Sequence, residues 1–232
     1  MNLFRKFFSS VFHFLVPDLC IHCGLELLDG EIGCCVFCNE SLKNSPIKEV
    51  GQQLFISDEY VASVYVQFFF EKENAIQTLL HGLKYQGNFH IASFFANYFL
   101  SRFPQEICST EGLMPVPIHP KKRFKRGYNQ CDLIARHLCY TLQKPRLNSL
   151  VFKVVNNASQ TRKNKGERME NTKNTFWVSP EIKRYTHLGI IEDVLTTGAT
   201  IRALTNAIKQ VHPSLKISFF VVASAVECKE NS

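Results

Sequence analysis

The segment from residue 188 to residue 200, LGIIEDVLTTGAT, arranges carboxylates, hydroxyls and a glycine in an order that could bind a ligand. An apolar run leads into two adjacent acids, Glu192 and Asp193, and then into a small, hydroxyl-rich turn that opens a predicted helix. Backbone N–H groups at a helix start bind anions, Gly198 allows a close approach, and threonine hydroxyls add donors. Carboxylates just before such a turn can accept hydrogen bonds from vicinal hydroxyls. The segment therefore predicts a site for a 5-phosphoribosyl group, and it contains neither the GxxxxGK(S/T) nor the GxGxxG motif.

Two C-x-x-C pairs form a second candidate site, with eleven residues between them: Cys20 with Cys23, and Cys35 with Cys38. Two such turns can place four thiolates tetrahedrally around zinc, and a closed four-thiolate site is structural because it keeps no position for a substrate. The neighbouring Cys34 and His22 could each replace one of these ligands. Reduced core cysteines without a metal are the alternative.

The cysteine count and the N-terminal segment together indicate the cellular compartment of the protein. The chain has nine cysteines, an odd total that is concentrated near the N-terminus, which is unlike a secreted disulfide scaffold. Residues 1–16 show the periodicity of an amphipathic helix and are followed by no small-residue cleavage site. No apolar run approaches the roughly 18 residues that a transmembrane helix needs. We therefore expect a cytoplasmic protein with no transmembrane segment.

The positive charge is concentrated in one part of the chain. The sequence has 27 Lys+Arg against 20 Asp+Glu, a net charge of +7, whereas residues 121–173 hold 14 of those cations against three acids, a local charge of +11. The run 121–126 carries five cations around Phe124, which fits a polyphosphate or, through charge and stacking, single-stranded nucleic acid. A solvated basic face is the alternative. The long polar stretch 156–174 could close over an anionic ligand, with Arg168 among its cations.

Hydrophobic periodicity predicts the elements that must position these residues. Helical patterns fall in 73–83, 90–102, 130–142 and 199–211, and strand-like runs fall in 60–70, 113–118, 150–154, 176–178, 188–191 and 216–223. Strands that alternate with helices indicate an α/β fold with a parallel sheet and crossover connections. In such a sheet we expect 113–118 to lie beside 188–191.

Length and composition set the domain organisation. A chain of 232 residues with 45% hydrophobic residues is neither disordered nor fibrous, and it can form one domain with a small appendage. We expect an N-terminal helix over 1–16, a zinc ribbon over 17–45 and one α/β domain over 46–232.

The segment 188–200 resembles the motif by which type I phosphoribosyltransferases bind phosphoribosyl pyrophosphate (PRPP): four apolar residues, two acids, two apolar residues and Thr-Thr-Gly-x-Thr. Other motifs extend the resemblance over nearly the whole chain: the two cysteine pairs, Leu83-Lys84-Tyr85 with Gly87, Pro115-Val-Pro117 with Arg126-Gly-Tyr-Asn-Gln130, and Gln160, Arg168, Asn171 and Phe176. Together they make the chain similar to the ComF family, in which a zinc ribbon precedes a phosphoribosyltransferase-like domain. The additional Cys34 and the glutamate at position 192 depart from the family pattern.

The resemblance implies a type I phosphoribosyltransferase fold, with a parallel-sheet core flanked by helices, and structural zinc at Cys20, Cys23, Cys35 and Cys38. It implies PRPP bound with Mg²⁺, and Glu192, Asp193 and Arg168 as the catalytic group. Thr196, Thr197, Gly198, Ala199 and Thr200 would bind the 5-phosphate. The other predicted PRPP-binding residues are Lys84, Lys121, Lys122, Arg123 and Arg126.

The resemblance further implies a role in the uptake of single-stranded DNA during natural transformation, with a helicase-like partner. Two functions stay open at this stage. Either the chain transfers a phosphoribosyl group from PRPP to an acceptor that the sequence does not identify, or it is a non-catalytic module. Such a module would sense PRPP or another nucleotide, or would carry single-stranded DNA on its basic surface.

Overall fold

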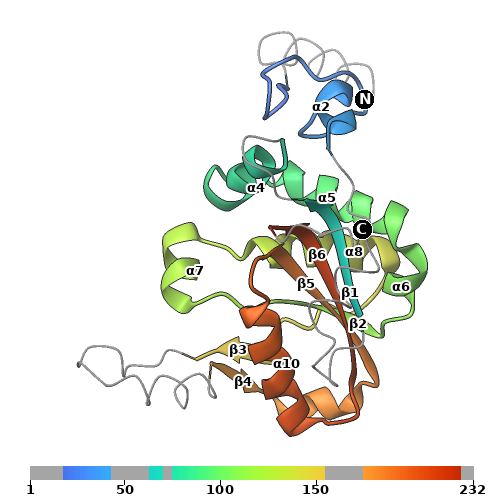
Figure 1. Ribbon diagram of the computed structural model, residues 1–232, viewed down its shortest axis with the longest axis vertical. Helices are drawn as coiled ribbons and strands as arrows, with labels where there is room; N and C mark the ends of the chain where they lie inside the picture. Colours follow the sequence, from blue (N-terminus) through green and yellow to red (C-terminus); the bar gives the residue numbers. More distant parts are fainter. Residues whose placement is uncertain (1–17, 43–62, 70–74, 155–174, 226–232) are drawn as a thin grey trace, which may run out of the picture.

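A four-stranded parallel sheet forms the centre of the molecule, in the order β1-β6-β5-β2 (Figure 1). The computed structural model describes residues 18–42, 63–69, 75–154 and 175–225. The strands are β1 (Ser63–Phe69), β2 (Gly112–Pro115), β5 (His187–Leu195) and β6 (Lys216–Ser224). As predicted, the strand around residue 113 lies beside the strand around residue 190, because β2 pairs with β5 in parallel. The predicted α/β class, a parallel sheet flanked by helices, is confirmed.

Helices cover both faces of this sheet. They are α4 (Ala75–Tyr85), α5 (His90–Arg102), α6 (Pro104–Cys108), α8 (Gln130–Leu142) and α10 (Ala199–Val211). Along β6 the side chains alternate between two cores, since Phe220 packs with residues of α4, α5 and α8, whereas Phe219 packs with residues of α10. This period of two is what a strand buried on both faces requires.

The helices nearest the predicted site begin where their caps dictate. The Asn129 side chain accepts a hydrogen bond from the backbone N–H of Cys131 at the start of α8. Helix α10 follows Gly198, whose φ of 72° is left-handed, and it buries Ile201, Leu204 and Ile208 along one stripe. Both helices match the predicted ranges 130–142 and 199–211.

Several elements differ from the prediction. Strand β5 continues to Leu195, so the two acids lie within the strand, where Glu192 is opposite Val221 of β6. The basic run forms a helix, α7 (Pro120–Arg126), for which no helix was predicted. The short strands β3 (Val151–Lys153) and β4 (Phe176–Val178) pair antiparallel in a separate sheet, with the 3-10 helix η1 (Pro180–Arg184) after them.

The cysteine pairs occupy a small unit over residues 18–42, which contains the helix α2 (Val36–Glu40) and a β-bridge between Leu19 and Glu26. Four of its five cysteines, all but the exposed Cys23, pack in the same core as α4 and α5. The predicted helix over 1–16 lies outside the described residues. Among the described residues, no helix is both long and apolar enough to cross a membrane.

Candidate functional site

The two adjacent acids lie at the carboxyl end of β5, and both side chains are buried. Glu192 is 7% exposed and Asp193 is 8% exposed. The Lys84 ammonium at the end of α4 lies 2.5 Å from Asp193 Oδ2, and the Gln130 amide at the start of α8 donates to the same oxygen at 2.9 Å. The other oxygen, Asp193 Oδ1, accepts from the backbone N–H of Val194 at 2.9 Å. Asp193 therefore has a fixed orientation.

The two carboxyl groups ionise differently. Burial and then the charge of Asp193 raise the pKa of Glu192 well above its ordinary value. Burial also acts to raise the pKa of Asp193, but the Lys84 ammonium and the hydrogen bonds to the carboxylate outweigh it, so the pKa of Asp193 is lowered. The pair thus favours one proton on Glu192 and one negative charge on Asp193.

A network behind Asp193 joins the end of α4 to the turn between α7 and α8. The guanidinium of Arg126 donates to Gln130 Oε1 and lies over the ring of Tyr85, 5.0 Å from its centroid. The hydroxyl of Tyr128 donates to the backbone carbonyl of Leu83 at 2.6 Å. The motif Arg126-Gly-Tyr-Asn-Gln130 therefore holds Asp193 and the last turn of α4 in one arrangement.

The predicted phosphate loop connects β5 to α10. Gly198 takes the left-handed conformation, and the four other residues of the loop, Thr196, Thr197, Ala199 and Thr200, are exposed. The Thr197 hydroxyl accepts weakly from the backbone N–H of Ala199 at 3.4 Å, and Arg202 donates to the Thr197 carbonyl at 2.5 Å. A hollow of about 40 Å³ lies against this loop and is also lined by Glu192. The backbone amides of this loop lie at the start of α10, a helix of 13 residues, and can bind an anion beside the carboxylates.

The predicted cations divide into two groups. Lys84 and Arg126 reach the Asp193 network, whereas Lys121, Lys122 and Arg123 are exposed on α7. The predicted lid residue Arg168 lies outside the described residues, as do Gln160 and Asn171.

Lys153 is a further cation near the site. Burial, and then the charge of Lys122, lower its pKa, while the charge of Glu192 acts in the opposite direction. Lys153 and Arg123 line one cavity of about 430 Å³ between α7, α8 and β3. The sequence predicts a strand at position 153 and gives it no role in the site, because no neighbouring residue along the chain marks it as a site residue.

Cys131 also lies beside the acids. Its Sγ and a carboxylate oxygen of each of Glu192 and Asp193 lie within 4.8 Å of one another. Burial, and then the two carboxylates, raise the pKa of this thiol well above its ordinary value. Cys131 therefore packs as a neutral thiol against the acids. Only the motif that ends at Gln130 could have drawn attention to it.

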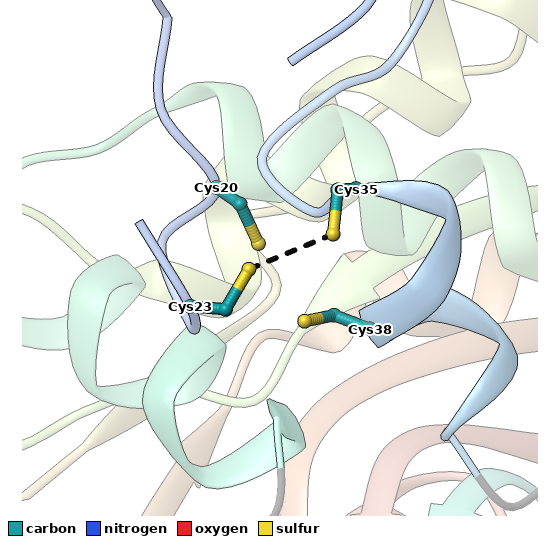
Figure 2. A group of neighbouring side chains, drawn as sticks. All are labelled: Cys20, Cys23, Cys35 and Cys38. Atoms are coloured by element: carbon teal, nitrogen blue, oxygen red, sulfur yellow. Dashed lines mark hydrogen bonds between the residues drawn. The ribbon is translucent and has the colours of Figure 1, made fainter. Parts of the chain in front are cut away.

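The four cysteines of the C-x-x-C pairs point toward one another, as Figure 2 shows. Their Sγ atoms lie within 4.8 Å of one another, and Cys23 Sγ is 3.7 Å from Cys35 Sγ. Four thiols at these distances could hold a metal such as zinc. Neither alternative ligand joins them, because Cys34 is buried outside the group and His22 Nδ1 lies 3.2 Å from Thr78 Oγ1.

No family model matches the chain. The chain is similar to Competence protein F of Haemophilus influenzae, with 25% identity over 83% of this chain and 91% of that protein. It is similar to DNA utilization protein YhgH of Escherichia coli K12, with 24% identity over 80% of this chain and 88% of that protein. Competence protein ComFC of Bacillus subtilis is 26% identical over 62% of this chain and 57% of that protein.

Among solved structures, the chain is similar to orotate phosphoribosyltransferase from Aeropyrum pernix, with 13% identity, a TM-score of 0.34, and coverage of 68% of this chain and 67% of that one. It is also similar to a hypoxanthine phosphoribosyltransferase from Staphylococcus aureus, with 11% identity, a TM-score of 0.30, and coverage of 60% and 69%. The relatives named for competence and DNA utilization match most of the chain, and they confirm the predicted resemblance to the ComF family.

Proposed function

We propose that this chain binds PRPP with Mg²⁺ at the carboxyl end of β5 and acts as a phosphoribosyltransferase-like protein in DNA uptake. One observation carries the proposal. Strand β5 ends two residues after a carboxylate of fixed orientation, Asp193, and is followed by the turn 196–198, whose two threonines are exposed at the start of α10. A carboxylate that could accept hydrogen bonds from ribose hydroxyls and a turn that could bind a phosphate are therefore a few residues apart, at the edge where ligands bind in open α/β sheets.

Each part of PRPP has a proposed partner. Glu192 and Asp193 hold the ribose hydroxyls, and Thr196–Thr200 bind the 5-phosphate. The cations Lys121, Lys122, Arg123 and Arg126 neutralise the pyrophosphate, with Lys84 balancing the charge of Asp193 and Arg168 closing from the lid segment. Mg²⁺ bound to PRPP would lower the negative charge of the pyrophosphate.

The reaction that fits this arrangement is transfer at C1 of the ribose. The bond from C1 to the pyrophosphate oxygen breaks, and its electron pair leaves with pyrophosphate. A nucleophilic atom of the acceptor forms the new bond to C1 and releases its proton. The residues at the end of β5 would stabilise the positive charge that develops on the ribose, and the cations would stabilise the leaving group.

The names of the relatives support the cellular role. Competence protein F and DNA utilization protein YhgH are similar to most of this chain. We therefore propose that the chain takes part in the handling of DNA taken up during transformation. Its location in the cytoplasm and its helicase-like partner are further proposals, which rest on the resemblance to the ComF family.

Calorimetric titration of the full chain with PRPP, with and without Mg²⁺, tests the proposal. We expect binding that depends on Mg²⁺ and that is weaker for ribose 5-phosphate, which lacks the pyrophosphate. Release of pyrophosphate is then measured over a set of candidate acceptors, with and without single-stranded DNA. Absence of PRPP binding would refute the proposal, and binding without release of pyrophosphate would favour the sensing module over the transferase.

Single-stranded DNA binding is a second candidate, and specific side chains favour it. Phe124 is 92% exposed among the cations of α7. Phe152 and Trp177 are 49% and 51% exposed, and their ring centroids lie 5.8 Å apart on the β3–β4 pair. Exposed rings beside cations are the features that bind single strands, through stacking on the bases and charge on the backbone.

Trp177 is the single tryptophan of the chain, so its fluorescence reports on this surface. We expect quenching when a thymidine oligonucleotide is added, and weaker binding when Lys121, Lys122 and Lys125 are changed to Glu. The control changes Lys183 and Arg184 to Glu, because these exposed cations lie on η1 before the amino end of β5. If the α7 variant binds the oligonucleotide as tightly as the unchanged protein, this candidate is wrong.

A further inference from the structure

We infer that the metal-binding ribbon positions the ligand site, because Ile21 and His22 hold α4 and thereby hold Lys84 against Asp193. These two residues lie between Cys20 and Cys23, inside the first metal-binding turn. The inference rests on the proposed function in one respect, which is that Asp193 contacts the ligand. It gives the cysteine site a role beyond keeping the ribbon folded.

The first contact is between Ile21 and Gly82 of α4. A Cβ atom on residue 82 would lie 3.5 Å from Ile21 Cγ2 and 2.9 Å from Ile91 Cδ1 of α5. The absence of a side chain at Gly82 therefore lets Ile91 of α5 approach the backbone of α4 closely, while Ile21 of the ribbon lies at ordinary van der Waals distance from the same position. A shift of Ile21 would therefore change its packing against α4 directly.

The second contact lies one turn earlier on the same helix. His22 Nδ1 is 3.2 Å from Thr78 Oγ1. Thr78 and Gly82 are four residues apart, so they lie on one face of α4. Both residues between the two cysteines thus contact a single stripe of the helix.

The second metal-binding turn fixes Ile21 in place. The backbone N–H of Ile21 donates to the carbonyl of Gly33 at 3.1 Å, and a Cβ atom on Gly33 would lie 3.7 Å from Ile21 Cδ1. In addition, the Tyr98 hydroxyl of α5 donates to the Asn39 side chain of α2. The conformation of Ile21 therefore depends on both halves of the ribbon, which four thiolates would hold together around one ion.

The other end of α4 reaches the ligand site. Lys84 is two residues after Gly82, and its ammonium lies 2.5 Å from Asp193 Oδ2. Leu79 and Leu83 of α4 are fully buried in a core that also contains Cys20 and Cys35 of the ribbon and Ile191 of β5. Close-packed side chains transmit displacements. Loss of order in the ribbon would therefore loosen α4 and lengthen the Lys84–Asp193 contact.

Metal removal from the full chain tests this coupling at α4 itself. Hydrogen exchange is measured by mass spectrometry with the metal bound and after treatment with a chelator. We expect exchange of residues 75–85 to rise at least about tenfold, as for a segment that opens locally, while α10 changes little. Unchanged protection of 75–85 after the metal has been removed would overturn the inference.

Substitutions at Ile21 test the coupling with the metal still bound. We expect Ile21→Ala to weaken PRPP binding about tenfold, a magnitude typical of residues that act through a shared contact, and Ile21→Val to restore most of it. Leu28→Ala is the control, since Leu28 is 70% exposed on the ribbon. Metal content is measured for each variant.

A double-mutant cycle with Lys84→Met distinguishes positioning from general stabilisation. If Ile21 acts through Lys84, Ile21→Ala has little further effect on PRPP affinity once Lys84 is replaced. Additive effects would show that Ile21 only stabilises the fold, and would overturn the inference. If the unchanged protein binds no PRPP, the proposed function fails, whereas the exchange of 75–85 still decides whether the ribbon holds α4.

Discussion

The Lys84 ammonium lies 2.5 Å from the Asp193 carboxylate, and this ion pair joins the end of α4 to the end of β5. Asp193 is buried, and burial alone would disfavour its charge. Lys84 and the Gln130 amide share one oxygen of the carboxylate and keep it ionised. The candidate site therefore contains a charged, oriented acid beside a second acid, Glu192, whose pKa is raised.

Replacing Asp193 by Asn should weaken PRPP binding at least about tenfold, since hydrogen bonds to charged groups contribute roughly 1.5–3 kcal/mol. Calorimetric titration with Mg²⁺ measures the change. Glu111→Gln is the control, because Glu111 accepts hydrogen bonds from Thr186 just before the amino end of β5. Equal affinity of the Asp193→Asn variant and the unchanged protein would exclude Asp193 as a ligand-binding residue.

Replacing Glu192 by Gln should change how stability depends on pH. Burial raises the pKa of Glu192 above its value in the unfolded chain, so this residue contributes stability at low pH that is lost as the pH rises toward the raised pKa. The neutral glutamine side chain of the variant has no proton to lose in this range, and we expect the substitution to stabilise the ligand-free protein more at about pH 8 than at about pH 5. Thermal unfolding between pH 5 and about 8 measures this, and parallel profiles for the two proteins would contradict it.

Replacing Gly198 by Ala should destabilise the fold and weaken phosphate binding together. The φ of 72° at Gly198 is strained for alanine, at a cost of about 1 kcal/mol. Gly30→Ala is a matched control, since Gly30 has a φ of 93° in the ribbon with open space around it. We expect both variants to unfold at lower temperature, but only Gly198→Ala to lose affinity for ribose 5-phosphate, measured by calorimetry.

Metal content should distinguish Cys35 from its neighbour Cys34. The sulfur of Cys35 lies in the group of four, whereas Cys34 is buried outside it, and burial together with the nearby thiols raises its pKa to about 12. We expect about one metal ion per chain, as a four-thiolate site binds. Elemental analysis should show loss of the metal in Cys35→Ser and retention in Cys34→Ala. The reverse result would reassign the ligands.

Elements with a periodic apolar pattern could be predicted from the sequence. Elements that form because of capping residues or strand pairing could not. Helix α10 follows its apolar stripe from Ile201 to Ile208. Helix α7 buries no side chain, so no apolar pattern marks it. It forms because His119 caps its first turn, Pro120 occupies its first position, and Gly127 ends it in the left-handed conformation. Similarly, backbone pairing with β6 extends β5 through two acids that look unlike a strand.

The candidate site, too, could be predicted only in part from the sequence. Asp193 and Gly198 are close in sequence, so the segment that holds them could be recognised directly. The bond from Gln130 to Asp193 depends on how α8 packs against β5, which no local pattern encodes. The choice between Cys34 and Cys35 likewise depends on the direction of adjacent side chains, which spacing alone leaves open.

The strand order β1-β6-β5-β2 has a consequence for synthesis on the ribosome. The inner strands, β5 and β6, are translated after the outer strands, and β1 pairs with β6. The two edge strands are therefore synthesised before the inner strands with which they pair. Until then they are exposed and prone to aggregate. The four cysteines that could hold a metal, by contrast, are complete by residue 38, so the nascent chain could bind an ion there before any strand of the sheet has been translated.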